Sequence, residues 1–301
     1  MARVPPARPH GLDATPPRVA PDHSTIRLLL ASVRPEQWTK NLLVFAGVVF
    51  GGRLMEPRAD AIAVATFAIF CALSGAVYLF NDIADREADQ NHPLKRERPI
   101  ASGRLSTTTA LLAGLVLGAA GLLGAFTIQT DLGLIAGAYL AMLLTYSVAL
   151  KHVVIIDVLV IAAGFVLRAI AGAVAVSVPI GHWLLVCTTL LAEGATDHRR
   201  ILDEYTPYLL DQMIGVVTSS TLIAYTVYAT SADTAARLGT AKLGLTIPFV
   251  LYGIFRYLYL VHQRREGGSP ATLLLTDRPL LACVALWGAG VVALLYSPLG
   301  K

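Results

Sequence analysis

The chain has 301 residues, of which 55% are hydrophobic and only 15% are charged, and its mean hydropathy is +0.62. This composition excludes a soluble globular protein and predicts a polytopic helical membrane protein, because apolar stretches of membrane-spanning length recur along the chain. The net charge of +4 comes from basic residues between these stretches, so it indicates membrane orientation and anionic ligands and not nucleic acid.

The apolar stretches predict an all-α bundle of about nine transmembrane helices in one domain. Residues 1–24 are rich in Pro, Ala and Arg without apolar periodicity, so we expect a disordered cytoplasmic tail before a single transmembrane catalytic domain over 25–301. The expected segments are 26–52 (bent near Pro35), 61–80, 106–127, 132–149, 153–176, 183–192, 213–230, 243–261 and 279–296.

The sixth segment is too short for a membrane helix. Its ten apolar residues, 183–192, cover about 15 Å at helical rise, or half of a bilayer core. Either residues 183–210 cross the membrane with their polar part buried in a cavity, or residues have been lost here.

Basic residues alternate between the two sides of the predicted bundle. One side holds Arg34, Lys40, Arg86, Lys95, Arg96, Arg98, Arg104, Lys151, Arg199, Arg200, Arg264, Arg265 and Arg278, and the other holds Arg53, Arg58, Arg237 and Lys242. Because cytoplasmic loops are enriched in Lys and Arg, we expect a multi-pass protein of the cell membrane with its amino terminus and the loop after residue 80 in the cytoplasm.

An acidic cluster follows the second segment directly. On a continuous helix, Asp82, Asp85 and Asp89 occupy positions i, i+3 and i+7 and share one face, with Asn81 about a quarter-turn away. Clustered carboxylates repel one another, and Mg²⁺, which prefers oxygen ligands, relieves this repulsion. We therefore predict a magnesium site formed by Asn81, Asp82, Asp85 and Asp89; the alternative is a solvated acidic helix end.

A basic run follows the acidic cluster. Lys95, Arg96, Arg98 and Arg104 come within fifteen residues of Asp89. Acidic residues hold a metal and basic residues hold phosphate, so the two runs together predict a Mg²⁺–diphosphate site. The alternative for each basic residue is the ordinary positive bias of cytoplasmic loops.

Charged residues also lie in and beside the later segments. Arg168 lies inside an apolar helix, where its charge costs several kcal/mol unless it faces a polar cavity or an anion, so we expect a phosphate or an internal carboxylate partner in preference to a packing salt bridge. Tyr146 and Lys151 flank the end of the fourth segment, where a hydroxyl and an ammonium can both reach a bound anion. Asp157 pairs with Lys151, serves the metal, or forms a simple surface ion pair.

A second charged cluster contains Arg199, Arg200, Asp203 and Glu204. The spacing fits helical ion pairs, and the functional alternative is a second acidic wall that faces Asp82 and Asp85 across the cavity.

These motifs resemble the UbiA superfamily of intramembrane prenyltransferases. The resemblance rests on Asn81-Asp82-x-x-Asp85-x-x-x-Asp89 followed by Arg98-Pro99-Ile100-Ala101-Ser102-Gly103. Three further stretches resemble its decaprenyl-phosphate phosphoribosyltransferase branch: Arg34-Pro35-x-Gln37-Trp38-x-Lys40-Asn41, Asp157-Val158 leading to Gly164-Phe165-Val166-Leu167-Arg168, and Leu202-Asp203-Glu204-Tyr205 through Leu210-Asp211-Gln212-Met213. The chain departs from the superfamily in lacking its usual second Asp-x-x-x-Asp motif.

The resemblance implies a transfer of 5-phosphoribose from phosphoribosyl diphosphate to a polyprenyl phosphate, with Mg²⁺ as cofactor and an arabinan precursor as product. It implies catalytic roles for Asp82, Asp85 and Lys151, and substrate contacts for Lys40, Tyr78, Lys95, Arg98, Tyr146, Arg168 and Arg199. Lys95, Arg98 and Lys151 would hold the phosphates of the water-soluble donor, and Arg168 the lipid phosphate.

Two other functions stay open at this point. A UbiA-type prenyltransferase would use the same metal site to move an isoprenoid from its diphosphate to an aromatic acceptor. A transporter would line a substrate path with the buried charges, although the charges gather at one face and not at the midplane. The expected partners are the two phosphorylated substrates and the lipid bilayer, without nucleic acid, and the sequence leaves open a homo-oligomer.

Overall fold

The computed structural model describes residues 24–153, 156–178, 207–263, 273–274 and 276–297. Its elements in chain order are α1 (Thr25–Ser32), η1 (Pro35–Phe45), α2 (Ala46–Phe50), α3 (Pro57–Ala84), α4 (Arg86–Gln90), η2 (Lys95–Glu97), α5 (Thr107–Ile128), α6 (Thr130–Val148), η3 (Leu150–His152), α7 (Ile156–Ala175), α9 (Pro207–Thr230), α10 (Ala232–Leu238), η5 (Lys242–Thr246), α11 (Ile247–Gln263) and α13 (Arg278–Tyr296).

The described chain forms the expected all-α membrane bundle. Five helical stretches are long and apolar enough to cross a bilayer: Pro57–Ala84, Thr107–Ile128, Thr130–Val148, Lys242–Val261 and Arg278–Tyr296. Two shorter apolar helices, Leu159–Ala175 and Ile214–Thr230, match the fifth and seventh expected segments. The count of nine stays a prediction, because the short sixth segment and the tail lie outside the described residues.

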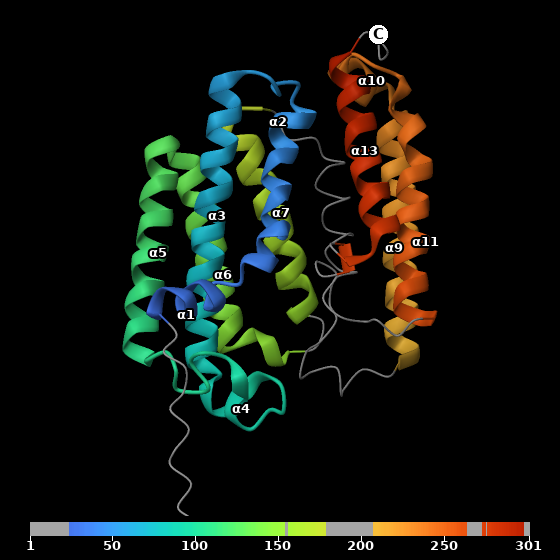
Figure 1. The fold of residues 1–301 in the computed structure, drawn as a ribbon. Coiled ribbons are helices and arrows are strands. Elements are labelled where there is room, and N and C mark those ends of the chain that lie inside the picture. Colours follow the sequence, from blue (N-terminus) through green and yellow to red (C-terminus); the bar gives the residue numbers. More distant parts are fainter. Residues whose placement is uncertain (1–23, 154–155, 179–206, 264–272, 275, 298–301) are drawn as a thin grey trace, which may run out of the picture.

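The first segment departs from the prediction of one bent helix. It divides into α1, the 3₁₀ helix η1 and α2, and α1 lies crosswise to α3 (Figure 1). The break falls at Arg34, whose φ of 53° and ψ of 70° are left-handed. The proline that follows disfavours the right-handed helical conformation at this residue, so the bend expected near Pro35 is confirmed while the continuous helix is wrong.

Helix α5 packs on α3 through small residues. Its buried positions are Ala110, Gly114, Gly118, Gly121 and Ala125, which allow the two backbones to approach closely. Its opposite face carries exposed apolar side chains such as Leu112, Val116 and Leu123. An apolar outer face suits contact with lipid, as expected for a membrane helix.

The two helix groups of Figure 1 meet at α2. The ring of Phe50 contacts that of Tyr228 in α9 edge-on, at 6.2 Å between centroids. The Tyr296 hydroxyl, in α13, donates to the Val49 carbonyl oxygen at 2.8 Å. Helix α2 therefore joins α9 and α13 to the group formed by α1–α7.

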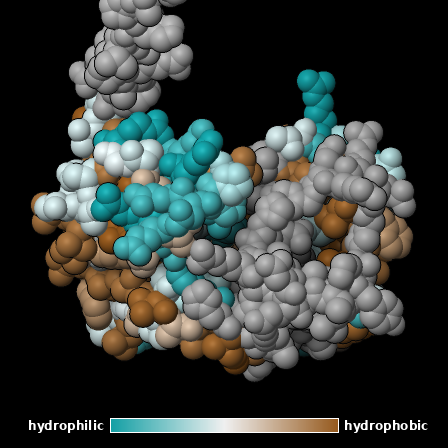
Figure 2. All heavy atoms as spheres, turned by 90° about the horizontal axis from the view of Figure 1, so that it is seen from below, coloured by the Kyte–Doolittle hydropathy of each residue, from teal (hydrophilic) through white to brown (hydrophobic). Residues whose placement is uncertain are grey.

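One end of the molecule is polar. Figure 2 views the molecule from below and shows hydrophilic residues gathered on this face, with hydrophobic residues around its rim. In Figure 1 this is the end at which α4 and the loop that leads to α5 lie. The acidic and basic runs of the sequence are therefore at one end of the bundle, as expected for residues at a membrane surface.

Helix α7 crosses η1 and α2 at two glycines. A Cβ atom at Gly172 would lie 1.9 Å from the Val44 carbonyl oxygen, and one at Gly47 would lie 2.4 Å from the Gly172 carbonyl carbon. Real Cβ atoms do not come this close to backbone atoms, so any larger residue would push the helices apart. This crossing places η1 beside α7.

We predict that Gly172→Ala lowers the stability of the purified protein by about 1–3 kcal/mol or more, because the added methyl group overlaps the backbone of η1. The measurement is the melting temperature in detergent. Gly137→Ala is the matched control: its Cβ would have nothing within 4 Å, and the same change in an open helix position is neutral or stabilising by up to about 1 kcal/mol. Equal melting temperatures for the two variants would contradict the close crossing.

Candidate active site

The acidic stretch spans two helices. Helix α3 ends at Ala84, Asp85 adopts φ −90° and ψ 5°, and α4 begins at Arg86. The expected continuous helix from Asp82 to Asp89 is therefore wrong. The two outer carboxylates still converge, because Arg98 Nη1 lies 3.2 Å from Asp82 Oδ1 and 2.7 Å from Asp89 Oδ2.

Two more cations bind the acidic cluster. Arg34 Nη2 lies 2.5 Å from Asp82 Oδ1, and Lys151 forms an ion pair with Asp85. Asp82 is 2% exposed, so its charge depends on these partners, since burying an unpaired charge is costly. The repulsion expected among the carboxylates is thus relieved by basic residues from three other segments of the chain.

The carboxylates suit a magnesium ion in kind. The ion pairs use Oδ1 of Asp82, Oδ1 of Asp85 and Oδ2 of Asp89, which leaves the second oxygen of each group as a hard donor. Within the described residues no three His, Cys, Asp or Glu side chains are grouped as a ready-made metal site. These oxygen donors fit Mg²⁺ in chemical type, but the carboxylates must come closer together to bind one ion. The ligands Asn81, Asp82, Asp85 and Asp89 therefore stay a prediction.

A cavity of about 210 Å³ adjoins the acidic cluster. It is lined by Arg34, Lys40, Ser74, Val77, Tyr78, Asn81, Tyr139, Leu143, Tyr146, Ser147, Ile161, Gly164, Phe165 and Arg168. Five of these residues were predicted for the site: Lys40, Tyr78, Asn81, Tyr146 and Arg168. The described lining contains three cations and no carboxylate, so the cavity is suited to anions.

Arg168 lies deep in this cavity and is 6% exposed. Its Nε donates to Asn41 Oδ1 at 2.7 Å, and its Nη2 donates to the Tyr139 hydroxyl at 2.6 Å. Of the two partners expected for Arg168, the internal carboxylate is wrong for the described part of the chain, where both acceptors are neutral. The phosphate stays a prediction.

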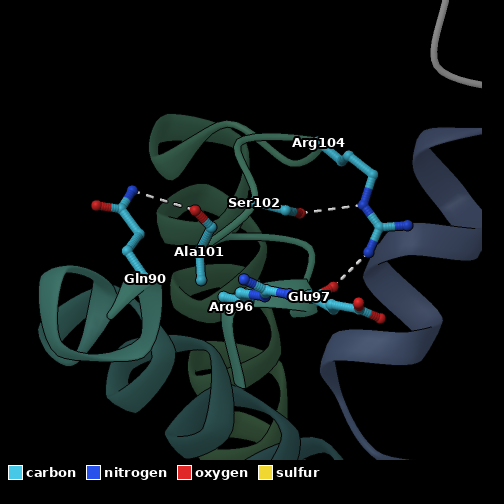
Figure 3. A pocket seen from close by; sticks show the side chains of 6 residues that line it. All are labelled: Gln90, Arg96, Glu97, Ala101, Ser102 and Arg104. Atoms are coloured by element: carbon cyan, nitrogen blue, oxygen red, sulfur yellow. Dashed lines mark hydrogen bonds between the residues drawn. The ribbon is translucent and has the colours of Figure 1, made fainter. Parts of the chain in front are cut away.

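The loop after α4 positions Arg98 but keeps other basic residues away from the cavity. Figure 3 shows a shallow surface hollow lined by Gln90, Arg96, Glu97, Ala101, Ser102 and Arg104. Arg104 donates to Ser102 Oγ and to the Glu97 carbonyl oxygen, and Gln90 donates to the Ala101 carbonyl oxygen at 3.1 Å. These bonds brace the turns on both sides of Arg98.

The remaining predicted residues are not placed in the cavity. Lys95 lies in η2, on the loop, and does not line the cavity. Arg199 lies outside the described residues, as do Arg200, Asp203 and Glu204, and so does the side chain of Asp157.

Sequence reasoning missed three residues of the site. Arg34 was counted among the basic residues of the cytoplasmic side and in a stretch that resembles the family, without a role in the site. It binds Asp82 and lies over the Tyr78 ring, with its guanidinium carbon 4.8 Å from the ring centroid. Asn41 and Tyr139 were assigned no role. The one available signal was the polar stretch from Arg34 to Asn41 between two apolar runs.

Comparison with known proteins identifies the family of this chain. A model of the UbiA prenyltransferase family matches residues 41–300. The chain is 31% identical to a decaprenyl-phosphate phosphoribosyltransferase of Mycolicibacterium smegmatis over 315 aligned positions. This alignment covers 95% of this chain and 98% of that protein. It is 32% identical to a protein of the same name from Mycobacterium tuberculosis, over 91% of this chain and 96% of that one.

A solved structure has the same fold. The UbiA homolog from Archaeoglobus fulgidus, bound to DMAPP and Mg²⁺, superposes with a TM-score of 0.67 over 88% of this chain and 99% of that one, at 19% identity. The extent of the family match and the identity to its relatives lead to one conclusion: this chain is a multi-pass membrane protein that belongs to the UbiA prenyltransferase family.

Proposed function

We propose that the protein transfers 5-phosphoribose from phosphoribosyl diphosphate to a polyprenyl phosphate such as decaprenyl phosphate, for an arabinan cell-wall precursor. The observation that carries this proposal is the cavity lined by Arg34, Lys40 and Arg168 without a described carboxylate, beside an acidic cluster suited to Mg²⁺. Relatives named decaprenyl-phosphate phosphoribosyltransferase support the same reaction.

The cavity favours this reaction over prenyl transfer to an aromatic acceptor. Prenyl transfer has one phosphorylated substrate, and its diphosphate is bound at the metal site. A second buried cation such as Arg168, away from the acidic cluster, then has no second phosphate to bind. Phosphoribosyl transfer to a lipid phosphate gives both cationic regions an anion.

The proposed chemistry needs no general base. An oxygen of the polyprenyl phosphate, already anionic at neutral pH, forms a bond to C1 of the ribose as the bond from C1 to the diphosphate breaks. The barrier lies in charge separation, as negative charge grows on the leaving diphosphate and positive charge on the ribose. When bound, Mg²⁺ neutralises the leaving diphosphate.

The residues of this chain divide between metal and phosphates. Asn81, Asp82, Asp85 and Asp89 would hold the metal. Arg98 and Lys151 pair with these carboxylates in the structure, and with Lys95 from the loop they would hold the diphosphate. Arg168 and Lys40 would hold the second phosphate. Tyr78 and Tyr146 line the cavity, where their hydroxyls can contact either ligand, and Arg199 is proposed from the sequence alone.

We further propose that the site faces the cytoplasm of the cell membrane, because the acidic cluster lies at the end that carries most basic loops. Single cysteines test this orientation in a variant without native cysteines: Glu97→Cys lies on the polar loop, and Asp233→Cys lies in α10 at the other end (Figure 1). An impermeant thiol reagent applied to intact spheroplasts should label the cysteine at 233 and leave that at 97 unlabelled until lysis. The reverse pattern would contradict the proposal.

Purified protein supplied with labelled phosphoribosyl diphosphate, decaprenyl phosphate and Mg²⁺ should produce labelled lipid. Asp85→Asn should reduce turnover by about 100-fold, equivalent to about 2.7 kcal/mol of transition-state stabilisation, because a metal ligand is lost. Asp131→Asn is the control and should leave turnover unchanged. Asp131 is exposed and lies at the start of α6, whereas Tyr146, which lines the cavity, lies near the end of that helix.

Turnover with an isoprenyl diphosphate and an aromatic acceptor, and none with phosphoribosyl diphosphate, would instead assign the protein to prenyl transfer. Net movement of a substrate across vesicles without chemical turnover would assign it to transport.

A further inference from the structure

The guanidinium of Arg168 has only neutral partners in the described part of the chain. It donates to an amide oxygen, that of Asn41, and to a phenol oxygen, that of Tyr139. Its central carbon also lies over two aromatic rings, at 4.9 Å from the centroid of Tyr139 and 5.3 Å from that of Phe165. Dipoles and ring faces stabilise a buried cation in part, but they leave its full positive charge in place.

The remaining nitrogen of Arg168, Nη1, lies beside a residue that lines the cavity. Nε and Nη2 make the two hydrogen bonds, while Nη1 lies 3.5 Å from the position of a Cβ atom at Gly164, a residue of the cavity lining. An anion in the cavity could therefore accept from Nη1 without displacing Asn41 or Tyr139.

The Asn41 amide is fixed in one orientation. Asn41 is 1% exposed, and its Nδ2 donates to Ser74 Oγ at 3.2 Å and to Cys71 Sγ at 3.3 Å. Arg168 has donors only, so Oδ1 must face it. An aspartate of the same shape would place a carboxylate against the guanidinium and neutralise it, whereas the amide accepts the hydrogen bond without cancelling the charge.

The Arg168 region is separate from the acidic cluster. Ser74, which contacts Asn41, precedes Asp82 by eight residues in α3, or about 12 Å at helical rise. A ligand or ligand group at Arg168 is therefore distinct from a diphosphate bound at the aspartates.

We propose that Asn41 is a positioning residue that orients Arg168 and keeps its charge uncompensated, so that Arg168 binds the phosphate monoester of a substrate. This inference rests on the proposed function, in which two phosphorylated ligands share the cavity. Both carry a phosphate monoester: the head of the polyprenyl phosphate and the 5-phosphate of phosphoribosyl diphosphate.

The test is direct binding of decaprenyl phosphate and of phosphoribosyl diphosphate with Mg²⁺, each measured separately on purified protein, so that it does not depend on turnover. Asn41→Asp should weaken binding of one ligand at least about tenfold, equivalent to about 1.4 kcal/mol, and leave the other unchanged. Loss of decaprenyl phosphate binding places the lipid phosphate at Arg168; loss of phosphoribosyl diphosphate binding places the 5-phosphate there.

Two controls separate charge from structure. Asn41→Ser removes most of the amide but adds no charge, so it should weaken binding less than Asn41→Asp while lowering the melting temperature more. Gln129→Glu makes the same amide-to-acid change at the junction of α5 and α6, at the far end of the bundle, and should leave both affinities unchanged.

A purely structural role for Asn41 predicts the opposite order, with the isosteric Asn41→Asp protein binding both ligands better than the Asn41→Ser protein. That order would overturn the inference. An Asn41→Asp protein that melts below the Asn41→Ser protein would also overturn it, because a carboxylate beside Arg168 should form a satisfied ion pair. If the wild-type protein fails to transfer phosphoribose while the Asn41 variants show the expected differences in ligand affinity, only the proposed function is contradicted.

Discussion

The pairing of buried charges between segments far apart in the chain is the constraint on which this site depends. Asp82 is nearly inaccessible to solvent and sits at the end of a membrane helix, where an unpaired carboxylate would be costly. Arg34, from the turn before η1, and Arg98, from the loop after α4, both bind it. These ion pairs fix two irregular segments against α3 at the polar end of the bundle.

The same constraint explains how the site divides into two regions. At the polar end, the carboxylates and the basic residues neutralise one another. If a metal ion bound the carboxylates while a diphosphate bound the basic residues, every charge would still have a partner of opposite sign. Deeper in the bundle, Arg168 is held by neutral acceptors and keeps its charge. The close crossing of α7 with η1 at Gly172 brings Asn41 within hydrogen-bonding distance of Arg168. The small residue at this crossing therefore allows Arg168 to have a neutral partner.

Much of the fold was predictable from local patterns. Apolar runs located α3, α5, α6, α7, α9, α11 and α13 to within a few residues, because a lipid environment requires long, continuous apolar helices. The grouping of Asp82, Asp89 and Arg98 followed from a short motif, since these residues are close in sequence. The family resemblance implied substrate contacts for Lys40, Tyr78, Tyr146 and Arg168, and all four line the cavity.

The rest depends on contacts that no local pattern encodes. Arg34 meets Asp82 across 48 positions, and Asn41 meets Arg168 across 127. The helix break at Asp85 was missed because helical periodicity continues through it. The ion pair of Lys151 with Asp85 was also missed, because the two residues lie 66 positions apart in the sequence.

Binding of Mn²⁺, a spectroscopic substitute for Mg²⁺, tests most directly whether the aspartates and the basic residues form one metal–diphosphate site. The measurement is the electron paramagnetic resonance signal of protein-bound Mn²⁺ after free ions are removed, with and without inorganic diphosphate. We predict that diphosphate increases the Mn²⁺ retained by the wild-type protein, because diphosphate supplies further oxygen ligands and takes Arg98 and Lys151 from the carboxylates. Equal retention with and without diphosphate, or equal retention by the wild-type and Asp85→Asn proteins, would contradict it.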